Sequence, residues 1–141
     1  MKIRHEVIIA RPCPEVFAFV TDLRNETRWQ PQIKSVTLEG PLRTGAHFHE
    51  RRVTLGFTFD WNFRITDLQP PRSISIETIE GTMPYRGTRS FQPVPGGTRV
   101  VESGELQLPA GLRWLEPSLA RWSRRPLRQA YDRLRALMEN E

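Results

Sequence analysis

The sequence is poor in cysteine, and Cys13 is the only one among 141 residues. A single cysteine excludes an intrachain disulfide and a structural zinc site built on cysteines, so nothing favours an oxidising compartment. Long apolar runs are also missing. The run near the N-terminus (7–10) has four residues, too short for a signal peptide, and nowhere do 18 apolar residues run together. We therefore expect a soluble, cytoplasmic protein without stable membrane insertion.

Clustered charge is scarce as well. The 21 Lys and Arg, nearly all Arg, exceed the 16 Asp and Glu by five, and they are spread along the chain with one denser cluster near residue 121. Such diffuse positive charge favours solubility more than a dedicated nucleic-acid face, so we expect no nucleic-acid partner. The cluster is interpreted either as a solvated helix face or as a contact surface for a membrane or an acidic partner. Its members, beside Trp122, are Arg121, Arg124, Arg125 and Arg128.

Familiar catalytic and cofactor motifs are absent. No GxSxG or HExxH occurs, and the glycines form no phosphate-binding loop. His47 and His49 have the spacing to share a metal on one strand face, but no third His or Cys is near them in the sequence. We therefore expect neither a metal nor a nucleotide cofactor.

What the sequence does contain is a long series of strand-like segments. Apolar–polar alternation or enrichment in β-branched residues marks seven of them, separated by turn signals at 55–56, 70–71, 81–84 and 96–97. Between the first two segments the period becomes helical, with one short helix begun by Pro14 and a second helical turn before Trp29. The predicted strands are residues 2–10, 33–39, 45–54, 57–67, 72–80, 85–94 and 98–108.

After Pro109 the pattern becomes that of a long amphipathic helix. Apolar residues recur at three- and four-residue steps, and the opposite face is mostly Arg. Pro117 suits a first helical turn, which makes residues 111–116 a short lead-in. Pro126 removes a backbone donor and crowds the preceding turn, so we predict a kink there. The apolar positions are Leu112, Leu115, Leu119, Trp122, Leu127, Ala130, Leu134, Leu137 and Met138.

This order of elements predicts a single α+β domain over residues 1–141. One strongly curved antiparallel sheet must wrap around the last helix, because no other element can cover the apolar face of that helix. The sequence resembles the START-like, Bet v 1-like helix-grip proteins, and among them the bacterial polyketide cyclase/dehydrase-like (SRPBCC) group. The resemblance spans nearly the whole chain. Its matching segments are PCPEVFAFVTDLRNETRWQPQIKSV, GPLRTGAHFHERR, TFDWNFRITDLQPPRSISIET, YRGTRSFQPVPGGTRVVESGELQLP and LEPSLARWSRRPLRQAYDRLRALM.

The resemblance implies a deep cavity between the concave face of the sheet and the long helix. Every odd position from 55 to 65 is apolar, so the aromatic residues of this segment share one face, which we expect to point inward. These rings either fill the core or line the cavity. They are Phe57, Phe59, Trp61 and Phe63.

The predicted hairpin registers place four charged side chains on the inward face. Glu50 and Arg52 share it with the aromatic rings, and Arg89 lies diagonally beside Glu102 on the second hairpin. A two-residue loop at 55–56 pairs Thr54 with Phe57, Arg52 with Phe59, Glu50 with Trp61 and Phe48 with Phe63. A loop at 96–97 pairs Pro95 with Thr98, Phe91 with Glu102 and Arg89 with Gly104.

Charged groups inside an apolar cavity cost several kcal/mol unless they are paired or hydrated. One interpretation is that Arg89 with Glu102, and Arg52 with Glu50, form ion pairs near the rim, where water reaches them. A second is that these four groups are polar anchors for a ligand. The third is that a one-residue bulge turns the predicted register over.

Two functions fit the implied cavity. The first is binding of a small apolar or amphipathic molecule by a monomer or homodimer; the alternative is a cyclase or dehydratase without metal or nucleotide cofactor. In such an enzyme Glu50 or Glu102 is the candidate base, Arg89 or Arg52 holds the oxyanion, and Tyr85 adds a hydroxyl donor. A protein–protein module would instead require a cavity filled by side chains. The candidate ligand-binding residues are Phe48, Arg52, Phe59, Trp61, Phe63, Tyr85, Phe91, Leu119 and Trp122.

Overall fold

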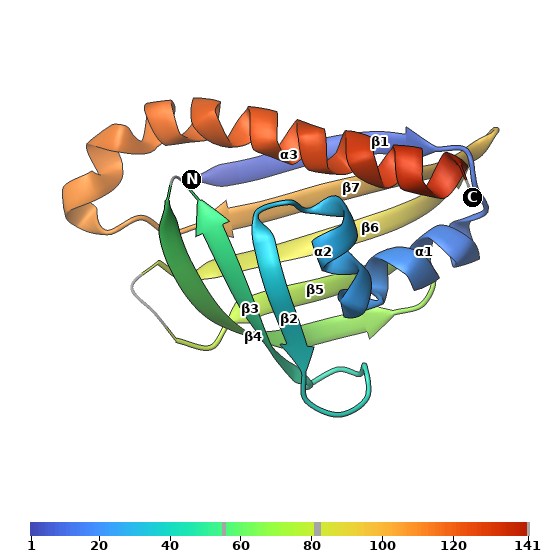
Figure 1. Ribbon diagram of the computed structural model, residues 1–141, viewed down its shortest axis with the longest axis horizontal. Helices are drawn as coiled ribbons and strands as arrows, with labels where there is room; N and C mark the ends of the chain where they lie inside the picture. Colours follow the sequence, from blue (N-terminus) through green and yellow to red (C-terminus); the bar gives the residue numbers. More distant parts are fainter. Residues whose placement is uncertain (55, 81–82, 141) are drawn as a thin grey trace.

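Seven antiparallel strands form one curved sheet in the order β1-β7-β6-β5-β4-β3-β2 (Figure 1). The computed structural model describes residues 1–54, 56–80 and 83–140. The seven predicted strands are confirmed, each within two residues of its predicted limits. They are β1 (Lys2–Ile9), β2 (Ile33–Leu38), β3 (His47–Thr54), β4 (Phe57–Gln69), β5 (Ser73–Thr78), β6 (Tyr85–Val94) and β7 (Gly97–Leu106).

Two short helices and one long helix accompany the sheet, as predicted. Pro14 and Pro117 each stand in the first turn of their helix, where a missing N–H removes no intrahelical hydrogen bond. The long helix runs through Pro126 without interruption, and the kink stays a prediction. The helices are α1 (Cys13–Thr21), α2 (Glu26–Trp29) and α3 (Glu116–Glu139), with 3-10 turns η1 (Leu23–Asn25) and η2 (Ala110–Leu115) before α2 and α3. Across the described residues, no helix combines the length and apolar character that a bilayer span requires.

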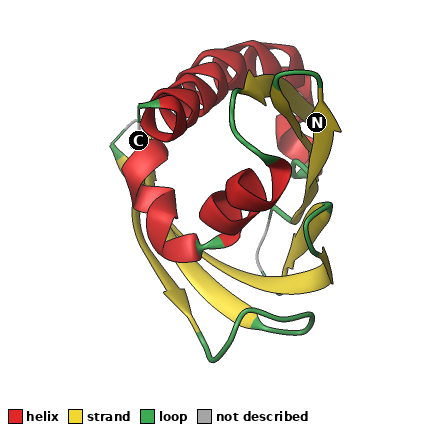
Figure 2. Cartoon of the chain, turned by 90° about the vertical axis from the view of Figure 1, so that its right-hand side faces the viewer, coloured by secondary structure: helices red, strands yellow, loops and turns green. Residues whose placement is uncertain are grey.

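The sheet topology places the short helices over its concave face. Strands β1 and β2 form opposite edges of the sheet, so the chain between them must cross the whole sheet. It does so through α1, η1 and α2. Seen from the end, the strands curve around these helices, and α3 lies along the remaining open side (Figure 2).

The β3–β4 hairpin has the predicted register. Glu50 lies opposite Trp61, and Arg52 lies opposite Phe59. Leu55, in the first predicted loop, and residues 81–82, in the turn predicted at 81–84, lie outside the described residues. The strand pairings on both sides of these positions are nevertheless described, so the inward face of the sheet follows from them.

The β6–β7 register differs from the prediction by two residues. The turn is formed by Pro95 and Gly96 rather than by residues 96–97. Gly96 has a φ of 84° and follows a proline, the combination that suits a type II turn. A shift of two leaves every side chain on its predicted face, because side chains alternate with a period of two. Arg89 is therefore directly opposite Glu102 instead of diagonally beside it.

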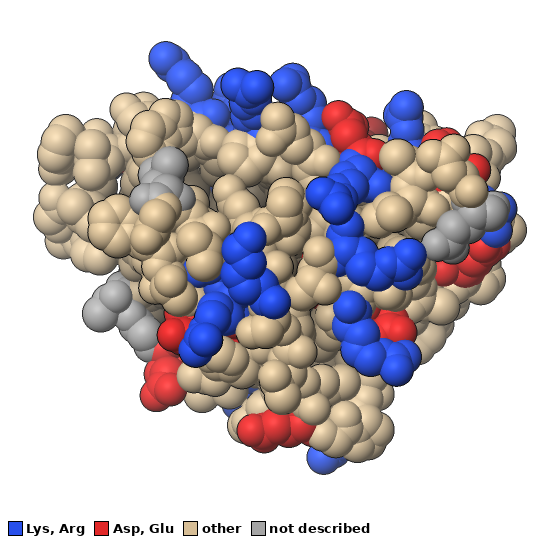
Figure 3. Space-filling model, in the orientation of Figure 1, with Lys and Arg blue, Asp and Glu red and all other residues tan. Residues whose placement is uncertain are grey.

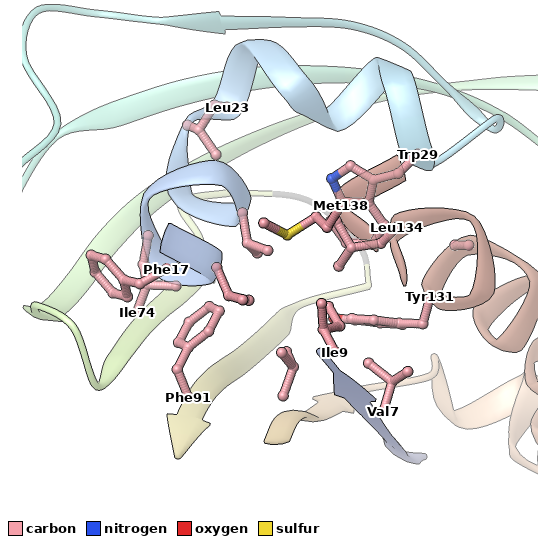
Figure 4. Close-up of a cluster of buried hydrophobic side chains, with 14 of the residues drawn as sticks. Val7, Ile9, Phe17, Leu23, Trp29, Ile74, Phe91, Tyr131, Leu134 and Met138 are labelled. Atoms are coloured by element: carbon pink, nitrogen blue, oxygen red, sulfur yellow. The ribbon is translucent and has the colours of Figure 1, made fainter. Parts of the chain in front are cut away.

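The main core lies where the C-terminal half of α3 meets the sheet and α2 (Figure 4). Tyr131, Leu134 and Met138 are each at most 2% exposed, and they face fully buried Trp29 and Ile9. Trp29 and Tyr131 place their ring centroids 5.1 Å apart. The close packing of these side chains attaches α3 to both α2 and β1.

The outer surface carries the positive charge in scattered form. In the face shown in Figure 3, Lys and Arg side chains are distributed over several elements, with acidic side chains between some of them. This distribution matches the diffuse charge expected from the sequence.

Truncating the buried side of α3 should destabilise the protein far more than truncating its exposed lead-in. We expect Leu134→Ala to lower the free energy of unfolding by about 2–5 kcal/mol, because it opens a cavity in a closely packed region. The same truncation at exposed Leu112 should change it by no more than about 0.5 kcal/mol. Urea unfolding monitored by circular dichroism measures both. Equal losses for the two variants would contradict the location of the core.

Candidate functional site

A cavity of about 220 Å³ lies between the concave face of the sheet, the short helices and α3. Apolar side chains form most of its wall, and charged side chains, uncharged polar side chains and one glycine form the rest. Its volume is below the range of about 300–1,000 Å³ usual for drug-sized ligands, so it suits a small molecule better than a long lipid chain. The apolar wall consists of Ile3, Val20, Leu23, Val36, Phe48, Trp61, Phe63, Ile74, Ile76, Leu106 and Leu127.

Strand alternation explains which side chains reach the cavity. Phe48, Glu50 and Arg52 are alternate residues of β3, and all three line it. Tyr85 and Arg89 do so from β6. The possibility of an inverted register is therefore excluded, and the predicted inward face is confirmed for the parts of both hairpins that line the cavity. The prediction is wrong for Phe57, which is 66% exposed at the end of the β3–β4 hairpin, beyond the cavity.

The first part of the charged wall is an ion pair within β3 that extends to α2. Arg52 donates to Oε1 of Glu50 through Nε at 3.0 Å and Nη2 at 2.9 Å. The same Nη2 lies 3.5 Å from Oε1 of Gln30, the residue that follows α2. Gln30 in turn donates to Oε2 of Glu26.

The second part joins α2 to the opposite side of the sheet. Arg89 donates through Nη1 to Oε1 of Glu26 at 2.7 Å and through Nε to Oε1 of Glu102 at 3.2 Å. Its guanidinium carbon also lies 5.1 Å from the ring centroid of Trp29. One connected set of side chains thus crosses the cavity, which we call the polar chain: Glu50, Arg52, Gln30, Glu26, Arg89 and Glu102.

Burial and charge set the protonation behaviour of the polar chain. Removal from water raises the pKa of Glu26, which is only 4% exposed; Arg89 opposes this shift, and the carboxylates of Glu50 and Glu102 add to it. Burial alone would lower the pKa of Arg89, but Glu26, Tyr131 and Glu102 together hold it well above its usual value. Arg89 therefore stays charged. Burial favours the protonated form of the Glu26 carboxyl group.

The ring of Tyr85 forms part of the wall and lies against two glycines of the sheet. A Cβ at Gly87 would lie 2.5 Å from its hydroxyl oxygen, and one at Gly104 would overlap the same atom, so the ring lies over this pair of glycines. Gly87 and Gly104 are partners across β6 and β7. Burial, with Glu102 nearby, raises the pKa of Tyr85 and keeps its hydroxyl protonated as a donor.

Eight of the residues predicted for the site do line the cavity, in agreement with the predicted inward face: Phe48, Glu50, Arg52, Trp61, Phe63, Tyr85, Arg89 and Glu102. The wall formed by the described residues does not include four others, Phe59, Phe91, Leu119 and Trp122. Phe91 is buried edge-to-face against Phe17, with 5.2 Å between the ring centroids. Trp122, on α3, is 62% exposed. Phe59 is half-buried. The inward face of a strand or helix therefore extends beyond the cavity at both ends.

The contribution of α2 to the cavity was not predicted from the sequence. Glu26 and Gln30 line the cavity and complete the polar chain, although neither was a predicted site residue. A signal for them exists, because Glu26 lies three residues before Trp29 and four before Gln30, spacings that share one helix face. An inward Trp29 therefore implies an inward Glu26.

Comparison with known protein families gives one match that spans the chain. The profile of a family described as polyketide cyclase / dehydrase and lipid transport matches residues 1–139. A comparison with curated protein sequences found no match.

Solved structures with this fold share little sequence with the chain. A Thermus thermophilus protein has a TM-score of 0.84 at 19% identity, and the match covers 96% of this chain and 95% of that protein. The Zhui aromatase/cyclase of a Streptomyces species has a TM-score of 0.80 at 15% identity, with 99% of this chain covering 93% of it. A Thalictrum norcoclaurine synthase, solved with a transition-state analogue, has a TM-score of 0.72 at 15% identity, with coverage of 97% and 92%. At such identities the likeness establishes the helix-grip fold.

The raised pKa of Glu26 predicts a pH dependence of stability with a definite sign. The folded protein holds the proton of Glu26 more tightly than the unfolded chain does. The resulting contribution to the free energy of unfolding is therefore present below pH 4.5, the ordinary pKa of this group, and is lost as pH rises through the folded pKa. Relative to Glu26→Gln, the wild type should lose stability over that interval. Urea unfolding of both proteins between pH 4 and 8 measures the difference, with exposed Glu39→Gln as the control. A difference that does not vary with pH, or that grows in favour of the wild type as pH rises, would contradict the assignment.

Proposed function

Because the chain belongs to the polyketide cyclase / dehydrase and lipid transport family over residues 1–139, we propose that it binds a small apolar or amphipathic molecule in the cavity beneath α3. The observation that carries this proposal is the cavity itself. It is lined by apolar and aromatic side chains, with polar groups concentrated in the polar chain. A mostly apolar pocket with a few convergent polar groups is the usual form of a small-molecule site.

The open volume also supports a binding role over a purely structural one. Had the aromatic rings filled the space under α3, a protein–protein module would be the better proposal. Instead Phe48, Trp61 and Phe63 stack against one another along one wall, with centroid distances of 5.0 and 5.7 Å, and leave the cavity open. These rings offer apolar contact area to a ligand, and the polar chain offers hydrogen bonds at the α2 side.

Occupying the cavity with a larger side chain should abolish binding. Val36 lines it from β2, whereas neighbouring Thr37 is exposed on the other face of the strand. We expect Val36→Phe to weaken binding of 2-naphthol at least tenfold, because the added ring takes the ligand's space, and Thr37→Phe to leave it unchanged. Quenching or shift of naphthol fluorescence measures both, once circular dichroism has confirmed that each variant is folded. If 2-naphthol does not bind the wild type, or binds Val36→Phe equally well, the proposed site is wrong.

A second candidate function, proton abstraction next to a carbonyl group, is favoured by one feature of the cavity. Carboxylates, guanidinium groups and the buried, protonated hydroxyl of Tyr85 line the same cavity. We propose Glu50 or Glu102 as the base that takes the proton from carbon. Arg89 or Arg52, with Tyr85, would hold the negative charge that moves onto the carbonyl oxygen. This is the first step of a cyclisation or dehydration.

Hydrogen–deuterium exchange tests that step without knowledge of the natural substrate. The α-protons of 2-tetralone exchange with D2O through the same enolate, and proton NMR follows their loss. If the site is catalytic, the wild type accelerates exchange over buffer, and Glu50→Gln or Glu102→Gln slows it by about 100-fold or more. Glu39→Gln, an exposed substitution of the same kind, should have no effect. A wild-type rate equal to that in buffer, or unaffected by both cavity variants, would remove the carboxylates from this role.

A further inference from the structure

The cavity wall contains more carboxyl groups than guanidinium groups. Three carboxyl groups, Glu26, Glu50 and Glu102, face two guanidinium groups, Arg52 and Arg89. The described lining contains no lysine or histidine that could supply a further positive charge. With Glu26 ionised the wall carries a net charge of −1; with Glu26 protonated, the form that its burial favours, the two remaining carboxylates balance the two guanidinium groups. Neither state leaves a spare positive charge for an anionic ligand, whose own charge would be uncompensated in the cavity.

Glu50 on β3 pairs with Arg52 through only one of its two carboxylate oxygens. Both hydrogen bonds from Arg52 go to Oε1 of Glu50. Among the described residues no donor reaches the other carboxylate oxygen, Oε2. Glu50 is nevertheless only 7% exposed, so its carboxylate faces the cavity rather than bulk water. Arg52, by contrast, keeps 35% of its side chain exposed and can remain partly hydrated.

Aromatic rings surround the same carboxylate. Trp61 is the cross-strand partner of Glu50, and Phe48 is two residues away on the same face of β3. Phe63, opposite Phe48 on β4, stacks on both rings, with its centroid 5.0 Å from that of Phe48 and 5.7 Å from that of Trp61. The faces of aromatic rings attract cations, and such contacts strengthen when water is excluded. A carboxylate oxygen without a donor, placed beside three such rings, is a suitable site for an ammonium group.

From this geometry we propose that the ligand of the cavity is an organic amine: a small aromatic or aliphatic body carrying one protonated nitrogen, which binds to Glu50 between the rings of Phe48 and Trp61. This inference rests on the proposed binding function and specifies its ligand class. The ammonium group donates to Oε2 of Glu50, and the neighbouring aromatic rings attract its positive charge. The apolar body occupies the remaining volume, which at about 220 Å³ admits one ring with a short side chain.

Three ligands of one shape test the proposal. Phenethylamine, 2-phenylethanol and phenylacetate share a phenyl ring and a short chain, and at neutral pH they are cationic, neutral and anionic. We expect isothermal titration calorimetry on the full chain to show the amine binding at least tenfold more tightly than the alcohol, with the carboxylate weakest. Equal affinities, or a preference for phenylacetate, would overturn the proposal. So would a complete absence of amine binding.

Variants separate the amine proposal from the proposed binding function itself. Glu50→Gln keeps a hydrogen-bond acceptor for Arg52 but removes the negative charge, so it should weaken the amine about tenfold and remove its preference over 2-phenylethanol. Glu39→Gln, an exposed acid on the neighbouring segment, should change neither affinity. If 2-naphthol binds in the cavity and Val36→Phe blocks it, but the amine shows no preference that depends on Glu50, the binding function stands and the amine proposal fails. If 2-naphthol also fails to bind, the binding function itself fails.

Discussion

Arg89 is the residue on which the arrangement of helices over the sheet depends. From β6 it pairs with Glu102 on β7 and with Glu26 on α2, and it lies over the ring of Trp29. The ring of Trp29 contacts Tyr131 of α3. Removing one partner of a buried ion pair costs about 3–5 kcal/mol, because the other charge is left uncompensated. The sheet, α2 and α3 are therefore held in one relative position by a few contacts around one guanidinium group.

The same contacts explain why a cavity persists beneath α3. Charged groups that pair across a space cannot be covered by apolar side chains without losing their partners or their hydration. The polar chain therefore stays at one side of the cavity, and the aromatic rings of β3 and β4 form the other. On the floor, Gly87 and Gly104 let the ring of Tyr85 lie flat against the sheet instead of across the open volume. The result is an amphipathic cavity in a protein whose core is otherwise apolar.

Prediction from sequence was most successful where one local period decides the outcome. The strands, the inward faces of both central hairpins and the final helix all follow from alternation or from three- and four-residue spacing. Three errors have physical causes. The β6–β7 turn lies at Pro95–Gly96 because a type II turn uses proline followed by glycine, and both candidate loops preserve the same faces. Phe91 lies outside the cavity wall because periodicity identifies a face, but not how far along that face the cavity extends. Trp122 belongs to the apolar pattern of α3 but is 62% exposed, because periodicity does not show which part of a helix other elements cover.

By itself the sequence determined which side chains turn inward, including the charged ones, because backbone geometry allows only two faces to a strand. Only the tertiary structure decided which of these side chains meet. Glu26 and Arg89 are 63 residues apart, yet their ion pair closes the polar chain. No local pattern contains that contact, since it depends on how the segment between β1 and β2 crosses a sheet whose curvature arises from all seven strands. The excess of carboxylates over guanidinium groups in the cavity becomes visible only after that crossing is known.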